Sequence, residues 1–155
     1  MNGRRIESTR IGIGIMPTIM QWVHLMAGVV GLGGMGFLLL ILIPSMGVLS
    51  EDQRAELSKA VAGRFRWTSW SAMALLLISG LYNVRRYYWE EPWDRAWKFL
   101  AVKVILSFLI FAIVLGVTIS FKLFEPLRAR RRMLLLVAFI LGVAVVLISA
   151  YLRRG

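Results

Sequence analysis

The chain has 155 residues, of which 59% are hydrophobic, a mean hydropathy of +0.72 and a formal net charge of +11. This apolar composition excludes an ordinary soluble domain, and the absence of cysteine excludes disulfides and thiolate metal sites. The basic residues stand at the ends of apolar stretches, which is typical of anchors that face anionic lipid headgroups. We therefore expect the lipid bilayer, and no nucleic acid, as the partner of this positive charge.

Four apolar stretches approach or exceed the roughly 20 residues that a helix needs to cross a bilayer. They lie at about 17–43, 67–84, 97–121 and 133–152. The first is far longer than the core of a signal peptide, so we expect it in the mature protein. The sequence thus predicts an all-α polytopic membrane protein, a single domain over residues 1–155 that forms a bundle of four transmembrane helices. Both termini should lie on the same side of the membrane, and equal numbers of Lys and Arg on the two sides leave the orientation open.

The helix boundaries are marked by short local signals. Pro17 suits the first turn of the first helix, after an interfacial lead-in over residues 1–16, and Pro44 should end this helix. Ser50 to Gln53 has the pattern of a capping box, in which the serine hydroxyl and the glutamine amide satisfy free backbone donors. A new helix should therefore start at this point.

The region that follows the capping box predicts an amphipathic helical extension before the second span. Apolar residues recur at a spacing of four, with charges between them: Leu57, Val61 and Phe65. Because no proline or loop separates Arg66 from Trp67, we expect the extension to run directly into the second span. Trp67 and Trp70 would then mark one membrane interface, and the aromatic-rich loop between Arg85 and Lys98 the other.

The one histidine of the chain, His24, lies in a segment with no charged side chain from Ile11 to Ser50. Lys103 lies at a matching depth in the third span, which runs in the same direction, so both should be roughly 10 Å inside the same interface. A shared site requires both side chains to face the bundle interior, whereas Lys103 can instead be an anchor that snorkels to the interface. The other polar residues expected at this level are Gln21, Ser79, Tyr82, Asn83, Ser107, Ser149 and Tyr151. These positions predict one polar layer near one side of the membrane.

Residues of two kinds share one stripe of the first helix with His24. At spacings of three and four, the stripe contains Met16, Met20, His24, Gly28, Gly31 and Met35. The stripe can be a packing surface, with small residues for close helix contact and methionines as fillers. It can equally be a site, in which His24, Met20 and Met16 hold Cu(I), or in which His24 binds a haem iron beside Gly28 and Gly31.

The sequence contains no Ser/His/Asp arrangement, paired acidic dyad or phosphate-binding loop, so it gives no positive sign of an enzyme. Every carboxylate lies in a tail or loop, which excludes an acidic proton relay through the membrane. A single histidine also excludes bis-histidine haem ligation within one chain and a closed zinc site.

Several short segments together resemble the copper-resistance D family of bacterial membrane proteins. They are Trp22-Val23-His24-Leu25, Gly33-Gly34, Pro44, Arg64-Phe65, Ser79-Gly80-Leu81-Tyr82 and Lys103. The resemblance covers about residues 19 to 121 and implies a four-helix unit in the bacterial cytoplasmic membrane that is concerned with copper uptake or tolerance. The haem-associated membrane protoporphyrinogen oxidases are more distantly similar, with a histidine in helix one and a lysine in helix three, here His24 and Lys103.

Three functions follow as hypotheses. In the first, the protein binds or passes copper at His24, with Met20 and Met16 as further ligands. In the second, it binds haem or a porphyrin, with His24 as axial ligand, Lys103 paired with a propionate, and Gly28, Gly31 and Tyr82 lining the site. In the third, it is a structural or assembly subunit whose glycine-rich first helix receives a helix of another membrane protein or of a second copy.

Overall fold

The structure, a computed structural model, describes residues 3–87, 95–119 and 130–152. The four long helices of this part of the chain are α1 (Gly3–Phe37), α3 (Glu51–Tyr87), α4 (Arg95–Thr118) and α6 (Arg131–Leu152). Between α1 and α3 the chain passes through the π-helical turn η1 (Leu38–Leu42), the short α2 (Ile43–Ser45) and the 3-10 turn η2 (Met46–Val48). The predicted all-α class is therefore confirmed.

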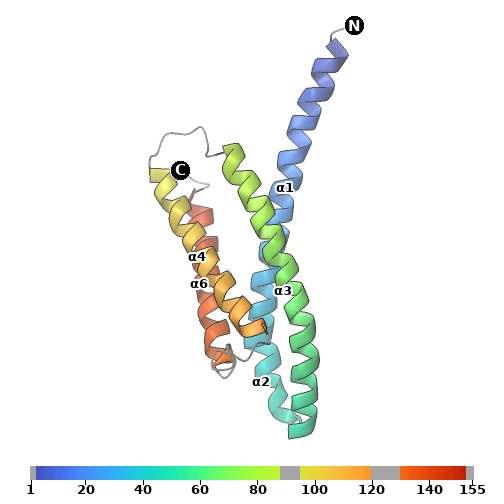
Figure 1. Cartoon of the computed structure of the whole chain (residues 1–155), viewed down its shortest axis with the longest axis vertical. Helices are drawn as coiled ribbons and strands as arrows, with labels where there is room; N and C mark the ends of the chain where they lie inside the picture. Colours follow the sequence, from blue (N-terminus) through green and yellow to red (C-terminus); the bar gives the residue numbers. More distant parts are fainter. Residues whose placement is uncertain (1–2, 88–94, 120–129, 153–155) are drawn as a thin grey trace.

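The helices pack as two pairs. α1 lies along α3, and α4 lies along α6, while the contacts between the two pairs are fewer (Figure 1). α2 is at the end where α1 turns back into α3, and the first turns of α1 extend away from the other helices. Both pairs are antiparallel, since α1 and α4 run downward in Figure 1 and α3 and α6 run upward.

Three helical segments of the described residues are long and apolar enough to cross a membrane: Gly14–Val48, Trp97–Thr118 and Arg131–Tyr151. These segments correspond to the first, third and fourth predicted spans. α3 is not among them, because its first half is charged and its second half includes several polar residues. The membrane character of the chain is thus supported by three helices, and the span at 67–84 stays a prediction.

The first helix begins earlier than predicted. α1 starts at Gly3, so Pro17 lies inside the helix and not in its first turn. A proline in a helix interior removes one backbone hydrogen bond but does not have to end the helix. Beside it, the Thr18 hydroxyl donates to the carbonyl of Gly14 over 2.9 Å.

Pro44 does not end the helix, because the chain stays helical through α2 and η2 to Val48, but a widened turn comes before it. A proline has no N–H, and its ring crowds the carbonyl four residues earlier. In η1 the backbone changes to π-helical hydrogen bonding, in which the Ile43 N–H donates to the carbonyl of Leu38, five residues before it. The π-helical turn thus lies directly before Pro44, and the helix finishes in the 3-10 turn η2.

The predicted capping box at the start of α3 is confirmed. The backbone N–H of Gln53 donates to Ser50 Oγ over 3.4 Å, and the N–H of Ser50 donates to Gln53 Oε1 over 3.2 Å. Arg54 adds a tie across the turn: its Nε donates to the carbonyl of Met46 over 3.1 Å and its Nη2 to that of Leu49 over 3.4 Å. These bonds satisfy backbone groups at the end of one helix and the start of the next.

The hydrophobic core lies toward the α2 end of the bundle and draws on all four long helices and η1. Its buried members are Met35, Leu39, Met73, Ile110, Val114, Val117, Leu135 and Ala138. Trp70 Nε1 of α3 donates to Thr118 Oγ1 of α4 over 3.1 Å and so joins the two pairs beside this core. The polar layer predicted around His24 is in the other half of the molecule, where the described chain has few buried residues.

Some predictions concern residues that the structure does not describe. The aromatic loop between Arg85 and Lys98 falls largely on 88–94, and the arginine-rich last loop on 120–129. The predictions for these loops, and for the arginines of the two tails, therefore lie outside the described side chains.

Candidate functional site: a polar seam between α1 and α3

The best-defined polar group inside the bundle lies between α1 and α3. His24 Nδ1 is 2.9 Å from Ser79 Oγ, and Ser79 is fully buried. One turn away, Asn83 Nδ2 donates to Gln21 Oε1 over 3.3 Å. We call these four residues the polar seam. On α1 the two residues of the seam are three positions apart, and on the antiparallel α3 they are four positions apart. Each pair of positions is about one helical turn, so the two hydrogen bonds between the helices are also one turn apart.

The hydroxyl of Ser79 determines which nitrogen of His24 carries the proton. Ser79 Oγ is 2.5 Å from the carbonyl oxygen of Leu75, and a carbonyl only accepts, so the hydroxyl proton points to Leu75. Ser79 Oγ therefore accepts from His24 Nδ1–H. In the neutral ring this arrangement leaves the lone pair on Nε2, which is the nitrogen through which the ring can ligate a metal.

Gly80 gives the imidazole ring its place against α3. A Cβ at this position would lie 3.5 Å from His24 Cε1 and 3.9 Å from His24 Nδ1, so the ring packs directly over the backbone of α3. The ring is half-buried. Of the segment Ser79-Gly80-Leu81-Tyr82, two residues thus contact His24: Ser79 by a hydrogen bond and Gly80 by close packing.

The hydrogen bond between Gln21 and Asn83 leaves one polar atom of Asn83 without a hydrogen bond among the described residues. Asn83 Oδ1 is buried and has no such partner. Exchanging the oxygen and nitrogen of both amides keeps the Gln21–Asn83 bond and turns a nitrogen of Asn83 to the same place. In either assignment a buried polar atom of Asn83 lies one turn from the His24–Ser79 pair, where burial without a partner is costly.

The methionines and glycines of the predicted stripe differ in their surroundings. Met20 is half-buried and Met16 is half-exposed, on the turns before His24. A Cβ at Gly28 would meet nothing within 4 Å, whereas one at Gly31 would lie 3.9 Å from the Cβ of Ala72. Gly31 is therefore a packing position against α3, and Gly28 borders open space one turn from His24.

The other residues expected in the polar layer come from α3, α4 and α6. Tyr82 of α3 and Lys103 of α4 are half-buried. The hydroxyls of Ser107 and Ser149 donate to carbonyls of their own helices, those of Lys103 and Val145, over 2.8 and 2.7 Å. The equal depth and common orientation of His24 and Lys103 stay a prediction.

The described part of the chain contains no group of three or more His, Cys, Asp or Glu side chains that could hold a metal ion. A metal at His24 would therefore draw on softer or neutral protein ligands, and Met20 and Met16 are the ones on its own stripe. Sequence reasoning identified His24 and Ser79 but not their pairing. A signal for this pairing was present in the sequence. Gln21 and His24 are about one helical turn apart, as are Ser79 and Asn83, and the two helices that carry them are joined by a short turn.

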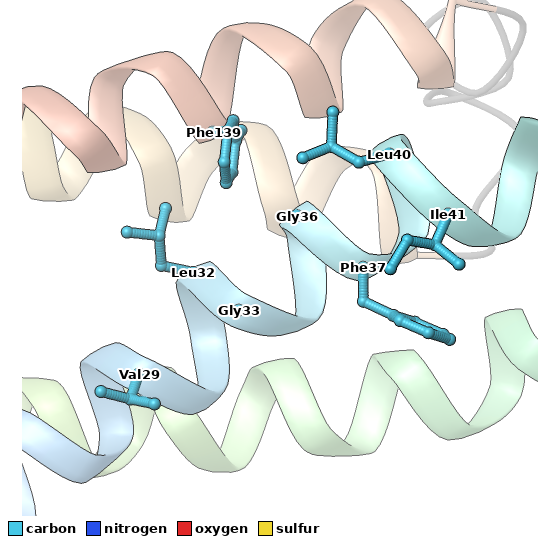
Figure 2. A pocket seen from close by; sticks show the side chains of 8 residues that line it. All are labelled: Val29, Leu32, Gly33, Gly36, Phe37, Leu40, Ile41 and Phe139. Atoms are coloured by element: carbon cyan, nitrogen blue, oxygen red, sulfur yellow. The ribbon is translucent and has the colours of Figure 1, made fainter.

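A second feature is an apolar groove of about 520 Å³ on another face of α1. It is lined by Val29, Leu32, Gly33, Gly36, Phe37, Leu40, Ile41 and Phe139 (Figure 2). Gly33 comes nine residues after His24, which is two and a half turns, so the groove and the polar seam lie on opposite sides of the helix. No family model, curated protein or solved structure matches the chain.

Proposed function

We propose that the chain is a four-span integral membrane protein of the bacterial cytoplasmic membrane that binds or passes copper at His24. The span that completes the set of four is the second one in chain order, the second half of α3 from Trp67 to Val84. The half of α3 before it is an amphipathic extension at the membrane surface. Two observations support this topology. The polar seam pairs α3 with the apolar helix α1, and Trp67 and Trp70 stand in edge contact, with ring centroids 6.1 Å apart, where the charged half ends.

The observation that carries the copper proposal is the hydrogen-bond chain from His24 Nδ1 through Ser79 Oγ to the carbonyl of Leu75. Such a bond on the far nitrogen orients an imidazole ligand and fixes its tautomer. With Nε2 as the ligating atom, thioether sulfurs from Met20 and Met16 would complete a soft donor set that suits Cu(I). Copper would be the cargo or signal of this site, in line with the resemblance to the copper-resistance D family.

Titration of the purified protein with Cu(I), against a competing chelator, tests the proposal. We expect one tightly bound ion per chain, complete loss of that binding in His24→Ala, and a weaker affinity in Met20→Leu, which removes one thioether ligand. Met26→Leu is the matched control, because Met26 is a half-exposed methionine of the same helix away from the stripe. Unchanged copper binding in His24→Ala would refute the copper site.

Haem is the second candidate, favoured by one observation. A Cβ at Gly28 would meet no atom within 4 Å, so a flat macrocycle can approach α1 one turn from His24. In this case Lys103 would pair with a propionate, and Tyr82 would line the site. Gly31 fits this proposal less well, because it already packs against Ala72.

One substitution separates the two candidates. Gly28→Leu fills the open space beside His24 without removing a copper ligand, so it should abolish a Soret band but leave Cu(I) affinity unchanged. A Soret band in the wild-type protein that is lost in both Gly28→Leu and His24→Ala would favour haem. If His24→Ala changes neither copper nor haem content, the remaining proposal is a structural or assembly subunit of a membrane complex.

A further inference from the structure

The apolar segment that begins in α1 is longer than a bilayer requires. Gly14–Val48 has 35 residues, whereas the apolar segments of α4 and α6 have 22 and 21. At 1.5 Å per residue, 35 helical residues extend about 50 Å, compared with a hydrocarbon core of about 30 Å. Roughly two fifths of this segment therefore lie outside the core, or the segment requires a steep tilt.

The charges of α3 decide between these two possibilities. The last turns of the apolar segment, Leu38–Val48, lie beside the first half of α3 (Figure 1). Two side chains of α3 bond to Met46 there: Arg54 Nε donates to its carbonyl over 3.1 Å, and Ser58 Oγ donates to its Sδ over 3.6 Å. That half of α3 carries charged side chains that are mostly exposed: Glu51, Asp52, Arg54, Glu56, Lys59, Arg64 and Arg66. Charges at membrane depth are costly, so this end of the α1–α3 pair projects beyond the hydrocarbon. The step rests on the proposed four-span topology.

The projecting end has an apolar surface that α3 does not cover. Phe37 is 52% exposed, Leu40 68%, Ile41 54% and Val48 90%. The first three of these also line the apolar groove, which continues along α1 to Val29 and is bordered on the other side by Phe139 of α6 (Figure 2). Outside the bilayer, a continuous apolar surface of this kind marks an interaction site.

The occupant of this groove has to meet two conditions. It must be a membrane helix, because the groove begins inside the span, and it must stay apolar past the membrane surface on the same side. The α1 segment of a second copy meets both, since it has the same surplus length and, in the same membrane, the same direction. A two-fold axis along the membrane normal brings the same patch of both chains together.

We propose that two copies of this chain form a parallel dimer in which the apolar groove of one α1 packs against that of the other. Gly33 lies in the groove, and a Cβ there would meet nothing within 4 Å in one chain. A small residue at this point lets two helix backbones approach closely, which is how membrane helices gain packing energy. Phe37 and Ile41 then flank the contact and continue it beyond the hydrocarbon.

Disulfide cross-linking of the full chain in membranes tests the dimer, because the protein has no cysteine of its own. Ile41→Cys and Phe37→Cys are the groove positions. Leu147→Cys on α6 and Ile78→Cys on α3 are matched controls, with 65% and 62% exposure but away from the groove. Oxidation should give a covalent dimer at Ile41 or Phe37 and less than a tenth as much at the controls, because a disulfide needs Cα atoms about 4.4–6.8 Å apart.

A second substitution tests whether the cross-link depends on the small residue in the groove. Adding Gly33→Leu to Ile41→Cys should reduce the cross-linked fraction at least fivefold, while Gly14→Leu, at another open glycine of α1, should leave it unchanged. Equal cross-linking at groove and control positions, or a monomer at every position, would overturn the proposal. A monomer at every position is also the result expected if another protein fills the groove. Adding His24→Ala to Ile41→Cys should not alter cross-linking, so failure of the copper site and failure of the dimer are distinguishable.

Discussion

Trp70 and Thr118 hold the two helix pairs together by one side-chain hydrogen bond. The indole Nε1 of Trp70 on α3 donates over 3.1 Å to Oγ1 of Thr118, the last residue of α4, which in turn donates to the carbonyl of Val114 over 2.6 Å. Both side chains are half-buried beside the core. The bond thus adds one directional contact to the hydrophobic core that the two pairs share.

Thr118→Val keeps the shape of the side chain but removes the acceptor of Trp70. The free energy of unfolding in detergent should fall by about 1 kcal/mol, since the indole N–H stays partly buried without a partner. Thr68→Val is the control, because the Thr68 hydroxyl donates only to the carbonyl of Arg64 in its own helix and the residue is exposed. An equal loss of stability in both variants would contradict the proposed tie.

The tautomer of His24 can be read directly, because the chain has one histidine and labelled imidazole nitrogens give one pair of signals. At a pH where the ring is neutral, ¹⁵N NMR should show a protonated Nδ1 and an unprotonated Nε2. Ser79→Ala removes the acceptor of Nδ1–H and should mix the two tautomers. Ser149→Ala, whose hydroxyl donates only to the carbonyl of Val145, should leave the spectrum as in the wild type.

Gly36 is the position on α1 where added volume should be tolerated least. A Cβ there would lie 3.0 Å from Cε2 of Phe139, whose ring also packs against the hydrophobic core, so the ring would have to shift. Alanine is favoured over glycine in a helix by about 1 kcal/mol, so an uncrowded substitution should stabilise the protein. We expect Gly63→Ala, where nothing lies within 4 Å, to raise the free energy of unfolding and Gly36→Ala to lower it. If both substitutions stabilise, the Gly36–Phe139 contact is looser than the structure indicates.

Arg54 should matter for stability more than the other exposed basic residues of α3. Arg54→Met breaks the bonds to the carbonyls of Met46 and Leu49 while keeping most of the side-chain length, and should destabilise by about 1 kcal/mol. Lys59→Met is the control, on the same helix and exposed. Thermal unfolding of the two variants in one detergent decides the point, and a smaller change for Arg54 than for Lys59 would count against the tie.

Much of the helical arrangement could be predicted from the sequence, because local rules govern it. The capping box at Ser50 and the continuation of α3 through Trp67 depend on residues within one or two turns. The end of the first helix was predicted at Pro44, but the chain stays helical to Val48. The start of α1 was placed wrongly at Pro17. Proline favours a first turn, but inside a helix it removes one backbone hydrogen bond and does not have to end the helix.

The polar seam shows what sequence patterns leave open. The spacing predicted a polar layer with His24, Lys103 and several hydroxyls, but a hydroxyl can bond to its own helix or to another. Ser107 and Ser149 take the first option, whereas Ser79 also accepts a bond from His24. This choice depends on which helix lies opposite and how far it is rotated, and that is a property of the packed bundle.

The sequence by itself determined that this is an all-helical protein with apolar helices of membrane-spanning length, because hydropathy, caps and proline act over short distances along the chain. Only the tertiary structure decided that α1 pairs with α3 and that His24 donates from Nδ1–H to Ser79. It also decided that side chains of other helices pack beside Gly31 and Gly36, whereas none does so beside Gly28 and Gly33. The reason is physical. The side of a helix that each residue occupies follows from its spacing, but what lies opposite is set by the competition among all helix faces for close packing.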